Sequence, residues 1–297
     1  MIAVAVTGDR SPATGDVVIH MPNSHLIDSA LTEDLGGGID ITSHAMIPND
    51  ARATARIVAK SASVLAGIAI AREIFLQVDP QLQWSCDRHD GEALAIGDVV
   101  ATIAGNTRAL LRAERVALNT LQHLCGIATI TRHCVNAVAS AGIAILDTRK
   151  TLPGLRAWQK LAVQAGGGKN HRMGLFDRYL VKSNHLVAHE SLDAALTVLD
   201  TNRDPNILLE VEVRTHNDID IAMNHRADWI MLDNFSPDQI CAAVQKISGR
   251  ANIEVSGGIT PENISHYAIP GITAISLGAL THSARAADLH MQLVEAC

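Results

Sequence analysis

The spacing of hydrophobic and polar residues changes about halfway along the chain. In the first half, residues 55–60 alternate between apolar and polar side chains, which is typical of a β-strand with one buried face. Over residues 107–139 apolar side chains recur at helical spacing, and we expect Gly126 to interrupt this helix. These patterns predict an α+β domain over residues 26–128, after an N-terminal extension over residues 1–25.

After residue 142 the pattern becomes one of short apolar runs separated by segments of helix length. Strands that alternate with helices predict a parallel sheet, here within a second domain over residues 129–297. Nearly every run ends in a polar residue or a glycine. In a (β/α) barrel the strand ends converge on one site, whereas an open doubly wound sheet would spread them along a crevice, so we predict a barrel. The predicted strands cover residues 143–147, 179–182, 207–213, 229–233, 253–256 and 274–277.

Composition excludes several classes of protein. Hydrophobic residues make up 47% and aromatic residues only 3%, which favours a packed core and argues against a stacking surface for nucleic acid. The longest nearly uncharged apolar stretch, residues 62–71, is far shorter than the ~20 residues that a membrane span needs. Residues 1–6 are apolar but lack the basic start of a secretion signal. The 5 cysteines form no CxxC pair, so we expect reduced thiols and a cytoplasmic protein.

The net charge of -7 hides a basic segment. Residues 147–185 contain eight basic and two acidic residues, while the rest of the chain is strongly acidic. A locally basic patch in an acidic protein suits a cleft for a small polyanion, because nucleic-acid binding would normally make the whole domain basic. We interpret Arg156 and Lys160 within this segment as part of a solvated helix face.

Four cations of the basic segment lie at or beside predicted strand ends. With His171 they would repel one another at a barrel mouth unless they faced an anion. We therefore expect a polyanionic ligand. The four are Arg149, Lys150, Arg172 and Lys182.

Two carboxylates close neighbouring apolar runs. Glu212 and Asp233 would be costly to bury there without a partner. Among so many cations they predict a site for Mg²⁺ or for ribose hydroxyls, although salt bridges to nearby Lys and Arg residues would explain them too. We expect Glu210 to point to the other face of its strand, so it ranks behind Glu212.

Glycine-rich loops follow three of the elements. Ser256, Gly257 and Gly258 follow one predicted strand and Gly278 follows the next. Such loops let backbone N–H groups approach a phosphate, and late barrel strands commonly build a phosphate site. Residues 166–168 are all glycine and precede His171 and Arg172, so this polar loop could bring both side chains over the ligand.

Together these motifs resemble those of the quinolinate phosphoribosyltransferases (nicotinate-nucleotide pyrophosphorylases, carboxylating). The resemblance runs from about residue 31 to about residue 283. Its most specific pieces are Glu33-Asp34-Leu35-Gly36, Asp40-Ile41-Thr42, Arg115-Val116-Ala117-Leu118-Asn119, Asp147-Thr148-Arg149-Lys150-Thr151, Pro153-Gly154-Leu155-Arg156, Gly166-Gly167-Gly168, Asn170-His171-Arg172, Glu210-Val211-Glu212-Val213, Leu232-Asp233-Asn234 and Ser256-Gly257-Gly258-Ile259.

The resemblance implies an α/β fold with an N-terminal α/β sandwich followed by an open, incomplete TIM-like α/β barrel. It implies a homodimer in which each sandwich caps the partner's barrel, so that Arg115 reaches the neighbouring site. The implied reaction joins quinolinate to phosphoribosyl pyrophosphate with Mg²⁺ and yields nicotinate mononucleotide, pyrophosphate and CO2 in NAD biosynthesis.

The resemblance also implies roles for individual residues. Lys150, Lys182, Glu212 and Asp233 would be catalytic, and the last two would also hold Mg²⁺, mostly through substrate and water. The implied substrate-binding residues are Arg115, Thr148, Arg149, Lys150, His171, Arg172, Lys182, Glu212, Asp233, Ser256, Gly257, Gly258 and Gly278.

One position departs from the family pattern, because Ser183 stands where the family usually has an Asp. Other interpretations also exist. A paralogue of the same fold, such as the relatives associated with molybdenum transport, could transfer phosphoribose or ribose to another acceptor. A lysine at a barrel strand end, here Lys182, also suits a Schiff-base aldolase. The last alternative is a phosphate-binding scaffold without catalysis.

Overall fold

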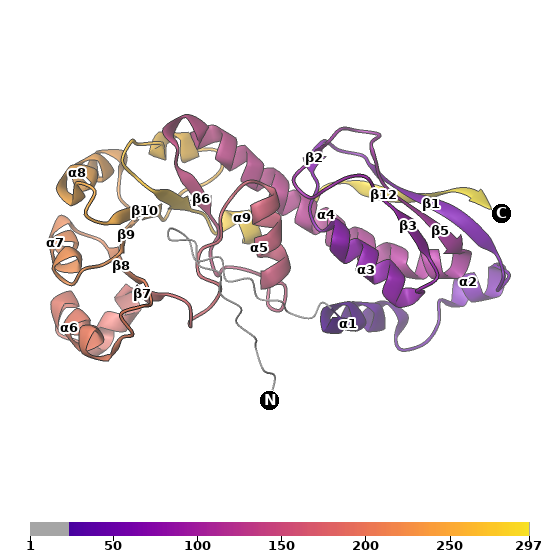
Figure 1. The fold of residues 1–297 in the computed structure, drawn as a ribbon, viewed down its shortest axis with the longest axis horizontal. Helices are drawn as coiled ribbons and strands as arrows, with labels where there is room; N and C mark the ends of the chain where they lie inside the picture. Colours follow the sequence, from indigo (N-terminus) through magenta and orange to yellow (C-terminus); the bar gives the residue numbers. More distant parts are fainter. Residues whose placement is uncertain (1–23, 297) are drawn as a thin grey trace.

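The computed structural model describes residues 24–296, so most of the predicted extension over residues 1–25 lies outside the described residues. Two large sheets, accompanied by a small two-stranded one, organise the described chain (Figure 1). The first is built mainly from the N-terminal half. The elements of this half are α1 (Ser24–Leu35), α2 (Ile41–Met46), β1 (Arg52–Ala59), β2 (Ser63–Val64), α3 (Ile68–Val78), β3 (Gln83–Ser85), β4 (Ala93–Leu94), β5 (Val99–Asn106) and α4 (Thr107–Val138).

The first sheet also includes a strand from the end of the chain, β12 (Leu289–Ala296). Its four strands lie in the order β12-β1-β5-β3, all antiparallel. In β1 the exposed and buried side chains largely alternate, as the sequence pattern predicts. The buried face packs on α3 and α4, with Ala55 and Ile57 in one core with Phe75 and Leu121. A sheet covered by helices is the predicted α/β sandwich.

The two parts of the chain do not divide at a single point. The predicted boundary between residues 128 and 129 falls inside α4, and the last strand, β12 (Leu289–Ala296), returns to pair with β1. The predicted second domain over residues 129–297 therefore gives its last strand to the first sheet. Sequence pattern does not report this pairing, because an isolated edge strand has no contact partner nearby in the chain.

Helix α4 is continuous, so the prediction that Gly126 interrupts it is wrong. A Cβ atom at this position would lie 2.1 Å from the backbone oxygen of Arg285. The glycine is needed for this close approach between the helix and the chain that leads into β12, and not for a break.

The second sheet has six parallel strands in the order β6-β11-β10-β9-β8-β7, so all six predicted strands are confirmed. The first and last strands do not pair, which leaves the barrel open as predicted. Its elements are η1 (Ala139–Ala141), β6 (Ala144–Leu146), α5 (Arg156–Ala165), β7 (Tyr179–Val181), η2 (Ser183–Ala188), α6 (Leu192–Asn202), β8 (Leu209–Val213), α7 (His216–Asn224), β9 (Trp229–Asp233), α8 (Pro237–Ile247), β10 (Asn252–Ser256), η3 (Ile264–Tyr267), β11 (Ala274–Ser276) and α9 (Ala279–His282).

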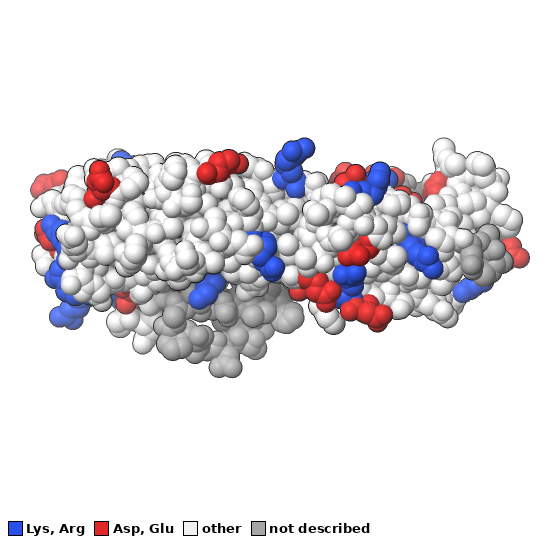
Figure 2. All heavy atoms as spheres, turned by 90° about the horizontal axis from the view of Figure 1, so that it is seen from above, with Lys and Arg blue, Asp and Glu red and all other residues white. Residues whose placement is uncertain are grey.

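Three further observations bear on the sequence predictions. Within residues 24–296 no helix is both long enough and apolar enough to cross a membrane. Cys86, Cys125, Cys134 and Cys241 are free thiols, while Cys297 lies outside the described residues. Figure 2 shows one face of the molecule, on which acidic and basic side chains are scattered among one another without a continuous basic surface.

Candidate active site

A pocket of about 780 Å³ lies where the six parallel strands end. Each strand delivers at least one polar side chain or glycine loop to it, which is the convergence predicted for a barrel mouth. The predicted site residues that line it are Thr148, Arg149, Lys150, His171, Arg172, Lys182, Glu212, Asp233, Ser256, Gly257, Gly258 and Gly278.

Arg115 is the predicted site residue that does not line this pocket. It lies on α4, its side chain is 56% exposed, and its nearest charged neighbour is Glu114 at 3.6 Å. The role that the resemblance implies for Arg115 in a neighbouring subunit stays a prediction.

The two predicted carboxylates face the pocket from adjacent strands, β8 and β9. Oε2 of Glu212 lies 3.0 Å from Nζ of Lys182, and Oδ2 of Asp233 lies 3.6 Å from Nε of Arg214. The salt bridges considered from sequence are thus present, and each carboxylate retains a second oxygen for a ligand. Such hard oxygen donors fit a Mg²⁺ ion that keeps water and substrate phosphate as its other ligands.

Arg214 was missed by the sequence analysis. Besides Asp233, it contacts Ser183, to whose hydroxyl it donates a hydrogen bond of 3.3 Å. The serine that departs from the family pattern is thus a neutral partner of this arginine. Arg214 directly follows the strand that carries Glu212, which is the signal that could have identified it.

The phosphate-loop prediction is supported by backbone geometry. Gly257 and Gly258 both adopt positive φ angles, 90° and 66°. A Cβ atom on Gly257 would lie 2.4 Å from Oδ1 of Asn234, and one on Gly278 would lie 2.7 Å from Cδ of Lys150. The left-handed backbone at Gly257 and Gly258 favours glycine, whereas at Gly278 the added atom would meet a flexible side chain. Consecutive glycines such as Gly257 and Gly258 can direct backbone N–H groups towards an anion.

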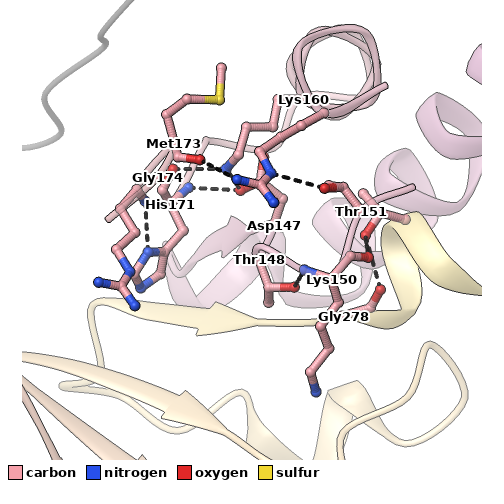
Figure 3. A network of polar contacts seen from close by, with 12 residues as sticks. Asp147, Thr148, Lys150, Thr151, Lys160, His171, Met173, Gly174 and Gly278 are labelled. Carbon is pink, nitrogen blue, oxygen red and sulfur yellow. Dashed lines mark hydrogen bonds and ion pairs between the residues drawn. The ribbon is translucent and has the colours of Figure 1, made fainter. Parts of the chain in front are cut away.

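A buried ion pair supports the wall of the pocket (Figure 3). Nζ of Lys160 donates hydrogen bonds to Oδ1 of Asp147 and, over 2.8 Å, to the backbone oxygen of His171. The same Asp147 oxygen accepts from the backbone N–H of His171 over 2.9 Å. The pair therefore holds both backbone polar groups of His171.

The interpretation of Lys160 and Arg156 as a solvated face is wrong. Lys160 is only 1% exposed, and Arg156 donates to the backbone oxygen of Met173 over 3.0 Å (Figure 3). Burial lowers the pKa of Lys160, and burial raises the pKa of Asp147 to about 6 although Lys160 opposes this rise. Helical spacing could have suggested that Lys160 faces inward, because Ala157 and Val163, three residues away on each side, both contact the core.

A second buried cluster lies beside the pocket and consists of His171, Glu210 and Glu254. Both carboxylates are fully buried, and Glu254 lines the pocket. Nε2 of His171 lies 3.1 Å from Oε2 of Glu210 and 3.3 Å from Oε2 of Glu254. These are ion-pair distances without the alignment of a hydrogen bond.

The expectation that Glu210 faces away from Glu212 is wrong. Side chains alternate along a strand, so residues two positions apart share a face, and both glutamates point into the barrel. The same rule applied to Ser256 would have identified Glu254 from sequence. Burial raises the pKa of Glu210, but its contacts with His171 and Arg178 outweigh this effect and lower it, whereas burial and the charge of Glu210 raise the pKa of Glu254.

The neighbours of His171 favour different protonation states of its ring. Burial lowers its pKa, but Glu254 and Glu210 raise it to about 9, which favours the imidazolium. The backbone N–H of Arg172, however, donates to Nδ1 over 2.7 Å, and a proton on Nδ1 would face that amide proton. This hydrogen bond therefore indicates a neutral ring that is protonated on Nε2 only. Nδ1 is thus engaged within the protein, while Nε2 carries the ring proton and faces the two buried carboxylates at 3.1 and 3.3 Å.

The guanidinium of Arg172 is also held from within. It donates from Nη1 to the backbone oxygen of Arg178 over 3.1 Å, and the residue is 9% exposed. Burial, followed by the nearby Arg149, lowers the pKa of Arg172. Two guanidinium groups at one pocket wall are costly without a ligand and suit a bound carboxylate.

Comparison with known proteins agrees with this geometry. Two family descriptions match, "Quinolinate phosphoribosyl transferase, N-terminal domain" over residues 40–125 and "Quinolinate phosphoribosyl transferase, C-terminal domain" over residues 127–292. The chain is 39% identical to "Probable nicotinate-nucleotide pyrophosphorylase (carboxylating)" of Bacillus subtilis (strain 168), over 92% of this chain and 94% of that protein. It is also 39% identical to "Quinolinate phosphoribosyltransferase (decarboxylating) 1b" of Nicotiana tabacum, over 90% of this chain and 81% of that protein.

Solved structures show the same similarity. NadC from Streptococcus pyogenes superposes with a TM-score of 0.88 at 36% identity, covering 97% of this chain and 100% of that chain. The nicotinate-nucleotide pyrophosphorylase from Francisella tularensis superposes with a TM-score of 0.87 at 37% identity, covering 92% and 98%. The chain described here therefore belongs to the quinolinate phosphoribosyltransferase family.

Proposed function

We propose that the protein is a decarboxylating quinolinate phosphoribosyltransferase of NAD biosynthesis. It joins quinolinate to phosphoribosyl pyrophosphate and releases nicotinate mononucleotide, pyrophosphate and CO2. The observation that carries the proposal is the meeting of lysines and arginines, two carboxylates and two glycine loops at one barrel mouth. A diacid, a sugar and phosphate groups need these three kinds of partner.

The quinolinate carboxylates bind to cations of the pocket wall. Arg149 and Arg172 offer planar guanidinium groups that can pair with a carboxylate through two hydrogen bonds, and Lys182 adds a point charge. Thr148 directs the loop, because its hydroxyl accepts from the backbone N–H of Lys150 over 3.0 Å. His171 contributes by holding Arg172, since its Nδ1 accepts the backbone N–H of that residue.

The phosphoribosyl group occupies the other side of the mouth. Its 5′-phosphate binds at Ser256, Gly257, Gly258 and Gly278, where backbone N–H groups can reach it. Lys150 packs against Gly278 and can neutralise the leaving pyrophosphate. Mg²⁺ supported by Glu212 and Asp233 would supply further charge neutralisation at the phosphates.

The first chemical step needs little proton transfer by the protein. The pyridine nitrogen forms a bond to the anomeric carbon while the bond to the pyrophosphate oxygen breaks, and positive charge develops on the ribose. Glu212 and Asp233 stabilise this charge, and the cations hold both reactants in line.

The second step is the loss of CO2. After the first step the ring nitrogen is positively charged, and the bond between the ring and the 2-carboxylate is next to it. The electron pair left on the ring carbon when CO2 departs is stabilised by that charge, and a proton then replaces the carboxylate. The protein's part is to hold the ring in place while CO2 leaves.

We also propose a cytoplasmic homodimer in which Arg115 of each subunit completes the neighbouring site. The exposure of Arg115 and its absence from the lining of its own subunit's pocket support this arrangement. Mixing Arg115→Ala with Lys150→Ala subunits, each nearly inactive alone, should restore up to about a quarter of normal activity, because half the dimers are mixed and each has one intact site. Failure to restore activity after verified subunit exchange would contradict shared sites.

The test of the function is an absorbance assay for nicotinate mononucleotide formed from quinolinate and phosphoribosyl pyrophosphate with Mg²⁺. Nicotinate serves as the control acceptor. We expect product and pyrophosphate in equal amounts with quinolinate and none with nicotinate. Activity on nicotinate alone, or no product from quinolinate, would refute the assignment.

A further inference from the structure

We propose that Glu210, which makes no contact with the pocket itself, is a positioning residue that sets the affinity for quinolinate by holding Arg172 in place through His171 and Arg178. This inference rests on the proposed function, because it concerns the arginine assigned to a quinolinate carboxylate. It also predicts that Glu254 contributes more weakly, through His171 alone.

One carboxylate oxygen of Glu210 joins two separate supports. Its Oε2 atom lies 3.1 Å from Nε2 of His171 and 3.2 Å from Nη1 of Arg178. All three side chains are buried, with exposures of 0%, 5% and 7% in the order Glu210, His171, Arg178. Arg178 donates a charge-assisted hydrogen bond to this oxygen, and the protonated Nε2 of His171 faces the same oxygen at close range. The buried charge of Glu210 therefore attracts and orients both side chains.

Each of the two supports ends on Arg172. Nδ1 of His171 accepts the backbone N–H of Arg172, and the backbone oxygen of Arg178 accepts from the Arg172 guanidinium. The main chain and the side chain of Arg172 are thus fixed by residues that both contact Glu210. Arg178 is additionally placed over the ring of Trp229, 5.2 Å from its centre, inside the barrel.

The surrounding charges favour this role over a metal site. His171, Glu210 and Glu254 have ligand atoms within 4.8 Å of one another, which is close enough to hold a metal ion. A metal on Nε2 would displace its proton and leave the neutral ring protonated on Nδ1, where the Arg172 amide already donates. Arg178 also supplies a positive charge to the same carboxylate that a metal would use.

The first test replaces Glu210 by Gln, which keeps the shape and removes the charge. We expect the KM for quinolinate to rise roughly tenfold to a hundredfold, by analogy with the loss of an outer-shell partner of a metal ligand. The kcat and the KM for phosphoribosyl pyrophosphate should change by less than about threefold, because the chemistry and the phosphate loops are untouched. Glu254→Gln should raise the KM for quinolinate by a smaller factor.

Asp220→Asn is the matched control. This carboxylate pairs with Lys246 on the outside of the barrel and is half exposed, so the same chemical change there should leave both KM values as in the unaltered enzyme. If Glu210→Gln is folded and has an unchanged KM for quinolinate, the positioning role is refuted. If the unaltered enzyme makes no nicotinate mononucleotide, the proposed function fails first, so the two failures are distinguishable.

A second comparison keeps the proposal testable if Glu210→Gln does not fold. Asn at position 171 can still accept the Arg172 amide through its side-chain oxygen, whereas Ala cannot. We expect His171→Asn to bind quinolinate several-fold more tightly than His171→Ala by calorimetry. Equal binding by the two variants would overturn the route through His171, and direct substrate binding by the imidazole would predict that equality.

Discussion

The mouth of the barrel and the buried layer beside it use charge in opposite ways. At the mouth, Lys182 is 42% exposed and pairs with Glu212, which lines the pocket and keeps a second carboxylate oxygen for a ligand. In the buried layer, Lys160, Asp147 and Glu210 are closed off from water and are paired with other protein groups. The comparison shows that the groups at the mouth bind the ligand, while the buried layer fixes the positions of those groups.

The largest effect that would test this contrast is on stability. Lys160→Met leaves the charge of Asp147 buried without its partner, so the free energy of unfolding should fall by about 3–5 kcal/mol. Chemical denaturation measures it. The double variant Asp147→Asn with Lys160→Met should recover much of the loss, since no charge is then left unpaired.

The surface pair of Lys246 with Asp220 provides the matched control for that experiment. Lys246→Met should cost no more than about 1 kcal/mol, because exposed ion pairs contribute little. Equal losses at the two lysines would remove the distinction between the buried layer and the surface.

The next effect concerns the mouth and should appear in activity only. Arg149→Ala removes a charged partner of a quinolinate carboxylate and should lower kcat/KM for quinolinate by roughly tenfold to a hundredfold, about 1.5–3 kcal/mol. Arg172→Ala should do the same. The free energy of unfolding should hardly change for Arg149→Ala. Arg203→Ala removes an arginine that pairs with Asp200 outside the pocket, so it should leave the kinetics unaltered. Near-normal kinetics in both pocket variants would refute the carboxylate clamp.

A smaller effect is expected at Gly278. A Cβ there would meet only the flexible side chains of Lys150 and His282, which can shift. Gly278→Ala should therefore change the free energy of unfolding by less than about 1 kcal/mol. Because the added methyl group crowds the loop proposed to bind the 5′-phosphate, the KM for phosphoribosyl pyrophosphate should rise several-fold. A large loss of stability with unchanged KM would mean that this loop supports the fold and not the phosphate.

The smallest effect lies outside both regions and sets a baseline for pH dependence. Burial lowers the pKa of His225, but Asp200 and Asp193, 2.7 and 3.1 Å away, raise it overall. Because the pKa is higher in the folded state, this stabilisation is complete below about pH 6.5 and is lost as pH rises through the folded value. Comparing unfolding of the unaltered protein and His225→Gln at about pH 6 and pH 9 should show a difference below about 1 kcal/mol that disappears at the higher pH.

The sequence by itself determined the six parallel strands, the barrel and the side chains at its mouth. These follow from local pattern, because a short apolar run that ends in a polar residue marks both a strand and its carboxyl end. Glu212 and Asp233 were predicted in this way, and both face the pocket. The error at Glu210 was of another kind, since the alternation of a strand, correctly applied, already places it beside Glu212 on the inner face.

Only the tertiary structure decided which charges are paired and which remain open to a ligand. The groups that pair with Lys160, Glu210 and β12 lie on other strands and loops. The pattern of apolar and polar residues in the sequence does not show which distant groups are in contact. Gly126 illustrates the same limit, because its need for a bare backbone arises from Arg285, far along the chain. Burial and pairing depend on neighbours in space, and these exist only once the chain has folded.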